Sequence, residues 1–159
     1  MSAEYSNAIP QTVQPNQPVI YNNAPCPCRE GLVFKKSGGV FLLASNAPTN
    51  NGCSCPCCRR LYQTNYEVEV HANIAVPDGG TVEEIQLAIA VDGVIDPASI
   101  MRFTPAAAEV AGNVGASIIV DVPSICGCEN VAIVSASTQP ITVEETTLTF
   151  NYAGVQRVR

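Results

Sequence analysis

The sequence predicts an all-β fold, an antiparallel sandwich of the jelly-roll type, with helix nearly absent. Two observations lead to this prediction. From Tyr62 onward, apolar and polar residues alternate with a period of two, the spacing at which a β-strand sends successive side chains to opposite faces. The apolar runs also recur at intervals of about 8–12 residues with turn residues between them, which is typical of antiparallel sandwiches and barrels.

The first part of the chain has a different pattern. Residues 1–31 contain five prolines and little periodicity, so we expect an extended N-terminal arm with one short strand at "PVIYNN". Residues 32–159 form the predicted jelly-roll domain. Near its start, "GLVFKKSGGVFLLAS" predicts a hairpin, because two apolar runs flank glycines that supply the positive φ of the turn. A cysteine-rich loop follows at 50–60, where Asn, Pro and Cys are too dense for a regular element.

The remaining chain reads as a series of strands. In "YEVEVHANIAVP" one face carries Tyr66, Val68, Val70, Ala72, Ile74 and Val76, and the other carries Glu67, Glu69, His71 and Asn73. In "TVEEIQLAIAVDG" one face carries Ile85, Leu87, Ile89 and Val91. "SIMRFTP" is a short strand, and "AAAEVAGNVG" fits one helical turn or a bulged strand, of which its glycines favour the strand. "ASIIVDVP", "ENVAIVSAS" and "ITVEETTLTFNYAGVQRV" complete the series.

Two of these strands, "LAIAV" and "VAIVSAS", are apolar on both faces. In a single two-sheet sandwich one face of each sheet meets water, so the excess of apolar residues needs a cover. We expect that cover to be another subunit, with loops of the same chain as the alternative.

Charge and hydropathy exclude several classes of function. The net charge of −6 opposes general nucleic-acid binding, which needs a basic stripe. Residues 1–60 carry five basic groups against two acids, and residues 61–159 carry three against twelve, so a basic arm is joined to an acidic body and can associate with its neighbours. No apolar run is long enough to span a membrane. The start, "MSAEYSNAIPQ", lacks the features of a signal peptide.

A family resemblance rests on the segments just quoted. The stretch from "NIAVPDGGTV" through "RFTPAAAEVAG" to "IIVDVPSICGCENVAIVSAS", with the hairpin "REGLVFKKSGGVFLLAS", resembles a group of short proteins of gut-dwelling Firmicutes and their phages. The resemblance covers roughly residues 17–152. It implies a jelly roll similar to the trimeric C1q and tumour-necrosis-factor domains, which also cap collagen-like stalks on bacterial spores. Such proteins usually have a cysteine after the opening hairpin and a pair at the position of Cys126 and Cys128, so the expanded "CSCPCC" and the "CPC" of Cys26 and Cys28 depart from the pattern.

The cysteines are the candidate functional residues. They fall in three clusters of two, four and two: Cys26 and Cys28; Cys53, Cys55, Cys57 and Cys58; Cys126 and Cys128. Structural zinc prefers C-x₂-C knuckles, a spacing that only Cys55 and Cys58 have. A redox-catalytic pair needs the N-terminus of a helix beside it, and no helix is predicted.

Disulfides explain the cysteines best. The members of a C-x-C pair cannot bridge each other without strain, so each seeks a partner in a different cluster or a different chain. We therefore predict that the cysteines staple the arm to its own domain or to a neighbouring subunit, with intermolecular bridges favoured. No cofactor is expected, and structural zinc bound by the cysteines is the alternative.

Other polar residues offer no active site. His71 shares a strand face with Glu67 and Glu69, where a metal is conceivable but a solvated face is the simpler interpretation. Asp92, Asp96 and Asp121 could be read as calcium ligands or as paired carboxylates for glycoside cleavage, but Asp92-Gly93 is better explained as a turn and Asp96-Pro97 as the start of a loop. No nucleophile-elbow, P-loop or H-E-x-x-H motif is present, so we expect no enzyme.

These observations lead to a functional hypothesis. We expect a structural homotrimer, able to assemble further, that decorates a phage capsid or forms part of a head fibre and contacts a capsid protein. The alternative is a subunit of a bacterial surface or spore appendage, polymerised by disulfides and in contact with a surface-layer protein. A second alternative is an adhesin module that binds glycans. Neither nucleic acid nor a membrane is expected as a partner.

Overall fold

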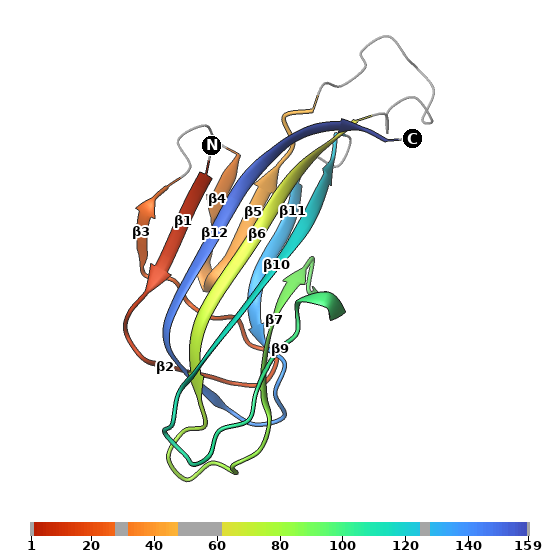
Figure 1. The fold of residues 1–159 in the computed structure, drawn as a ribbon. Helices are drawn as coiled ribbons and strands as arrows, with labels where there is room; N and C mark the ends of the chain where they lie inside the picture. The colour runs from red at the N-terminus through yellow and green to blue at the C-terminus, as the bar shows by residue number, and fades with distance from the viewer. Residues whose placement is uncertain (1, 28–31, 48–61, 125–127, 159) are drawn as a thin grey trace.

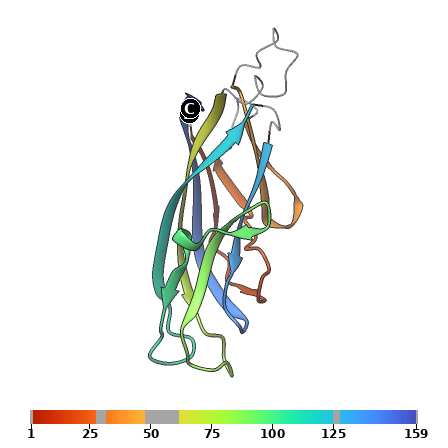
Figure 2. The same ribbon diagram turned by 90° about the vertical axis from the view of Figure 1, so that its right-hand side faces the viewer.

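The structure, a computed structural model, describes residues 2–27, 32–47, 62–124 and 128–158. These residues form two antiparallel β-sheets packed face to face, which confirms the predicted all-β sandwich (Figure 1). Turned by 90°, the two sheets stand as separate layers (Figure 2). Two short 3₁₀ turns, η1 (Ser37–Gly39) and η3 (Pro97–Ser99), are the only helical elements in these ranges.

Each sheet combines strands from distant parts of the chain. In the first, sheet A, the strand order is β10 (Gly112–Pro123), β6 (Tyr62–Ala75), β12 (Ile141–Arg157), β1 (Ser2–Asn7) and β3 (Asn23–Cys26), and β2 (Gln11–Val13) also pairs with β12. In the second, sheet B, the order is β4 (Val33–Lys35), β5 (Val40–Ala44), β11 (Cys128–Ser135), β7 (Ile85–Val91) and β8 (Val94–Ile95), and β9 (Met101–Phe103) also pairs with β7.

The core lies between the sheets and follows the predicted alternation. On β6, the predicted apolar face from Tyr66 to Ile74 is buried, whereas His71 on the opposite face is exposed. Phe41 of sheet B packs against aromatic rings brought from elsewhere, with ring centroids 4.6 Å from Tyr5, 5.2 Å from Phe150 and 5.7 Å from Tyr21. These contacts join β5 to β1 and β12, and so they join the two sheets.

The N-terminal segment differs from the prediction. The sequence predicts an extended arm over residues 1–31, but the structure places residues 2–26 within the sandwich. Strand β1 pairs with β12 along its whole length, and Tyr5 is buried. The backbone N–H of Val19 donates to the Ile133 carbonyl at 2.7 Å, and the buried Tyr21 hydroxyl hydrogen-bonds Thr146 Oγ1 at 3.0 Å. Residues 19–22, at the centre of the predicted "PVIYNN" strand, are not in a regular strand.

The predicted hairpin is confirmed, and its glycine has a second role. Strand β4 pairs with β5 in the register Val33 to Leu43. Gly39 has φ +76°, and a Cβ atom there would lie 2.2 Å from the Val19 carbonyl oxygen. Only glycine allows this close approach, so the hairpin turn also holds the N-terminal segment against sheet B.

The segment "AAAEVAGNVG" forms neither a helical turn nor a bulged strand in the part that precedes Gly112. Residues 104–111 form turns and irregular chain, and β10 begins at Gly112. A Cβ atom at Gly112 would lie 2.2 Å from the Phe103 ring, so this glycine lets β10 pass close to β9. The sequence predicts that the glycines of this segment allow a bulge, whereas Gly112 instead allows two strands to approach closely.

The doubly apolar strands are largely covered by the chain itself. Ala88 and Ala90 of β7 and Val134 of β11 are at most 9% exposed in a single chain. Residues 16–19 hydrogen-bond along one side of β11, and residues 94–99 lie along the other side of β7. These loops realise the alternative expected from the sequence along the two sides of this face, and they leave a groove between them.

Candidate functional site

Two of the eight candidate cysteines lie in the described residues. Cys26 ends β3 at the edge of sheet A, and Cys128 begins β11 in sheet B. Both are exposed, and neither forms a disulfide with another described residue. The other predicted crosslinking residues lie outside the described residues: Cys28, Cys53, Cys55, Cys57, Cys58 and Cys126.

The fold brings the chain flanking all three cysteine clusters to one end of the sandwich. The Ala44 N–H donates to the Leu32 carbonyl at 2.8 Å, and Cys128 is the register partner of Ala44. The Ser124 N–H donates to the Tyr62 carbonyl at 3.1 Å. We call this end, where Leu32, Ala44, Tyr62, Ser124 and Cys128 lie, the cysteine end; it is the upper end in Figure 1.

A polar network fixes the backbone at the cysteine end. Thr64 Oγ1 accepts from the Asn46 N–H at 3.1 Å and lies 3.1 Å from Ser45 Oγ. The Tyr66 hydroxyl donates to the Ala44 carbonyl at 2.6 Å. Asn46 Nδ2 reaches the Tyr152 hydroxyl at 3.2 Å. Because Thr64 is fully buried, these bonds replace water contacts and hold the chain that leads into the cysteine-rich loop.

The described thiols make few contacts of their own. Cys26 Sγ donates a weak hydrogen bond to the Ser2 carbonyl at 3.6 Å. Within the ranges that the structure describes, no three His, Cys, Asp or Glu side chains gather closely enough to hold a metal ion. The disulfide prediction and its zinc alternative both concern cysteines outside those ranges, so both stay predictions.

His71 lies on the exposed face of sheet A, as the alternation predicts. Its Nε2 is 2.9 Å from Glu69 Oε1, and the two side chains are 57% and 43% exposed. A Cβ atom at Gly115 would lie 2.6 Å from His71 Nδ1, so the imidazole sits over the glycine of the neighbouring strand. The pair is solvated, and Glu67 on the same strand bonds Ser117 instead.

The three aspartates considered from the sequence lie apart and serve local structure. Asp92 stands in the turn before Gly93 with φ +49°, and its Oδ1 accepts from both the backbone and the side-chain nitrogen of Asn130 at 2.9 Å. Asp96 caps η3 by accepting from the Ala98 N–H at 2.8 Å. These two confirm the predicted turn and loop start. Asp121 accepts from Asn65 Nδ2.

The fold also pairs two carboxyl groups that no sequence pattern predicts, those of Asp92 and Glu129. Glu129 hydrogen-bonds Asp92, and this bond, followed by burial, raises the pKa of Glu129 to about 7. The same bond, with the donors of Asn130, lowers the pKa of Asp92. Residues 92 and 129 meet because β7 and β11 pair in the register Val91 to Val131. No motif in either segment signals this contact.

Among the described residues no helix has the length and apolar character needed to cross a membrane. No protein-family model and no curated protein matches this sequence. Among solved structures, the chain is similar to the Eiger TNF of S. frugiperda, with a TM-score of 0.61 and 10% sequence identity over 97% of this chain and 93% of that one. At this identity the similarity shows the fold alone: a jelly roll of the tumour-necrosis-factor type.

Proposed function

We propose that this chain is a structural protein that assembles as a homotrimer through its jelly-roll body and is fastened to neighbouring molecules at the cysteine end. The observation that carries the proposal is the convergence described above. Backbone bonds bring Leu32, Ala44, Tyr62, Ser124 and Cys128 to one end of a fold of the tumour-necrosis-factor type.

Two features support this assignment. The chain on both sides of the cysteine-rich loop is held by a buried polar network, so thiols of this loop would be presented from a fixed base and not from a free arm. A bridge that closes a long loop stabilises by roughly 3–5 kcal/mol in the chain-entropy model, and one between subunits would make an assembly resistant to denaturants. Both effects suit a protein whose task is architectural.

The setting that we propose is a phage virion, as a capsid decoration or head-fibre protein in contact with a capsid protein. Its support is the resemblance of the hairpin and of the later strands to proteins of gut Firmicutes and their phages. A second setting, an appendage on a bacterial or spore surface, is favoured by the two exposed thiols on different sheets, Cys26 and Cys128. One subunit could then bond two neighbours.

Non-reducing gels test the fastening. Purified protein should run as covalent oligomers that collapse to one band when a reductant is added. The variant in which Cys53, Cys55, Cys57 and Cys58 are all changed to Ser should lose the ladder. The matched control changes Cys26 and Cys128 to Ser and keeps the loop cysteines, so it should retain covalent oligomers. A ladder that survives the fourfold change would show that the cysteine-rich loop is not the fastener.

A further inference from the structure

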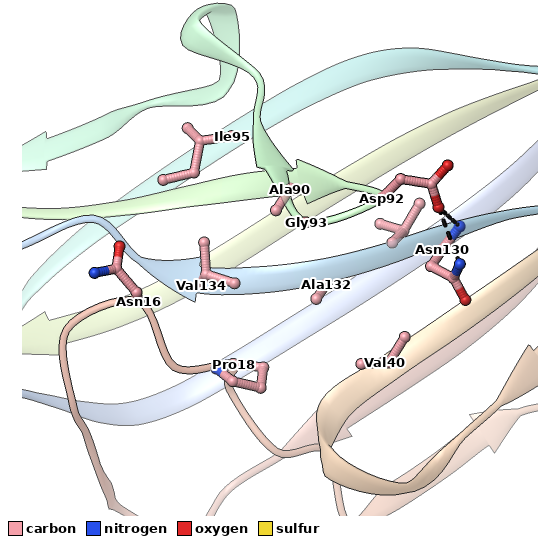
Figure 3. Close-up of a pocket in the computed structure, with 11 residues that line it drawn as sticks. Asn16, Pro18, Val40, Ala90, Asp92, Gly93, Ile95, Asn130, Ala132 and Val134 are labelled. Atoms are coloured by element: carbon pink, nitrogen blue, oxygen red, sulfur yellow. Dashed lines mark hydrogen bonds between the residues drawn. The ribbon is translucent and has the colours of Figure 1, made fainter.

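The outer face of sheet B carries a groove of about 580 Å³. Figure 3 shows its length, with Asn16 near one end, Asp92 and Asn130 at the other, and Ala132 and Val134 between them. The size is in the range of sites that take small organic molecules. None of the residues that define the cysteine end lines the groove, although Asn130 at one end of the groove follows Cys128 by two residues on β11.

The floor of the groove follows from strand register. Residues directly paired across strands share a face of the sheet, and the pairs Ile95–Ala90, Ala90–Ala132 and Ala132–Val40 make one row across sheet B. The two central members are alanines and the two outer members are larger. The row is therefore low in the middle and raised at its edges, which forms an apolar trough.

The walls are held in place from both sides. On one side, residues 16–19 are hydrogen-bonded to β11, and Gly39 packs directly against the backbone of Val19. On the other side, Asp92 and Gly93 form a tight turn with positive φ at both positions, which folds β8 back beside β7. The trough is thus a preformed feature of the backbone.

One end of the trough is negatively charged. Asp92 lines this end and accepts from Asn130, and Glu129 hydrogen-bonds Asp92 but does not line the groove. Among the described residues, Lys36 brings an opposing charge to this end, where its Nζ donates to Asn130 Oδ1 at 3.1 Å. Glu84 lies at the opposite end of β7 from Asp92 and is paired with Arg102 at 2.9 Å, so its charge is balanced.

We propose that this groove binds a small amphiphilic amine, with its apolar body along Ala90, Ala132 and Val134 and its ammonium group beside Asp92. The apolar floor contacts the body of such a ligand away from water, and the Asp92 carboxylate accepts a hydrogen bond from its ammonium group. Residues 130–134 of β11 rise about 3.3 Å each, so the floor is roughly 13 Å long, which suits an extended chain of moderate length. This site is independent of the assembly function proposed above.

Titration by NMR with octylamine, octan-1-ol and octanoate at pH 8 tests the proposal on the full chain in reductant. Octylamine should shift the methyl signals of Ala90, Ala132 and Val134 saturably and bind about tenfold more tightly than octanoate, with octanol between them. At this pH, which is above the pKa of about 7 of Glu129 and above the lowered pKa of Asp92, both carboxyl groups are ionised.

Two variants separate the floor from the charged end. Ala132→Leu fills the trough and should weaken octylamine binding by about tenfold or more, whereas Thr149→Leu, a matched change on the outer face of sheet A, should leave it unchanged. Asp92→Asn should erase the preference for the amine over the alcohol while octanol still binds. The fold should tolerate this change, because Asn before Gly is favoured in a turn with positive φ.

Three outcomes would overturn the proposal. The first is octanoate binding as tightly as octylamine, which would remove the charge recognition. The second is unchanged octylamine binding in Ala132→Leu, or shifts confined to residues outside the groove. The third is a linear, unsaturable response to all three probes, which would mean that no site exists.

Discussion

At the scale of single residues, Glu129 gives the structure a dependence on pH. Its pKa is raised from 4.5 to about 7, first by the hydrogen bond to Asp92 and then by burial. Between these two pH values the folded chain binds more protons at this residue than the unfolded chain does. The contribution of Glu129 to the free energy of unfolding therefore falls as the pH rises from about 4.5 to 7.

The variant Glu129→Gln should remove this slope, because glutamine keeps a donor for Asp92 and does not titrate. Denaturant unfolding at several pH values measures this slope. The free energy of unfolding of the wild type minus that of the variant should decrease as the pH rises from about 4.5 to 7. Below pH 3.8 protonation of Asp92, whose pKa is lowered, adds a loss of stability in acid. A difference in the free energy of unfolding that stays constant from pH 4 to 8 would contradict the raised pKa of Glu129.

Gly39 tests the close contact between the hairpin and the N-terminal segment. Gly39→Ala should destabilise the fold by more than about 2 kcal/mol, since it meets both a positive φ and the Val19 carbonyl oxygen. Gly79 is a matched control with φ +75° and open space around its Cβ position, so Gly79→Ala should cost only about 1 kcal/mol. Equal costs in chemical unfolding would show that the contact is not tight.

At the scale of elements, the strands of the body follow from the alternation of the sequence, and the N-terminal strands do not. Strands β6, β7, β10, β11 and β12 have long apolar faces, and their positions agree with the prediction within a few residues. Strand β1 spans only six residues, and β2 and β3 are shorter still. Prolines at 10, 15 and 18 lie between these strands, where no backbone N–H is needed for strand pairing. Because of these prolines the segment lacks a strand pattern in the sequence, and its short strands are stabilised by pairing with distant strands.

In the candidate site, too, some features can be predicted from the sequence and others depend on how distant strands pair. The cysteine clusters are visible in the sequence, but their convergence at one end needs the pairing of β5 with β11 and the bond between Ser124 and Tyr62. The Asp92–Glu129 contact and the groove floor depend on the register of β7 and β11. A one-residue slip would move every side chain to the other face, and sequence alone does not determine that register between distant strands.

Tyr5 tests whether the N-terminal segment belongs to the body. Its side chain is buried and packs on Phe41 and Phe150, so Tyr5→Ala should lower the free energy of unfolding by about 3–5 kcal/mol. Ile9→Ala, at a side chain that is 65% exposed, should change it by less than about 0.5 kcal/mol. If both variants unfold at the wild-type denaturant concentration, the segment is an appended arm after all.

At the scale of the whole molecule, the two outer faces differ in character. The outer face of sheet A carries acids and hydroxyl groups, including Glu67, Glu69 and Ser117. The outer face of sheet B carries the apolar groove. The cysteine end lies across both sheets. Different residues carry the proposed fastening and the proposed ligand site, so a change to one should leave the other intact.

The central claim, that the jelly-roll body itself associates, is tested most directly by light scattering on a sizing column in excess reductant. Removing all disulfides leaves only noncovalent contacts, so the mass then reports the association of the body. The account predicts a particle of three chains of 16.7 kDa each, about 50 kDa, at micromolar concentration and equally in the fourfold cysteine variant. A single chain of 16.7 kDa under these conditions would contradict it.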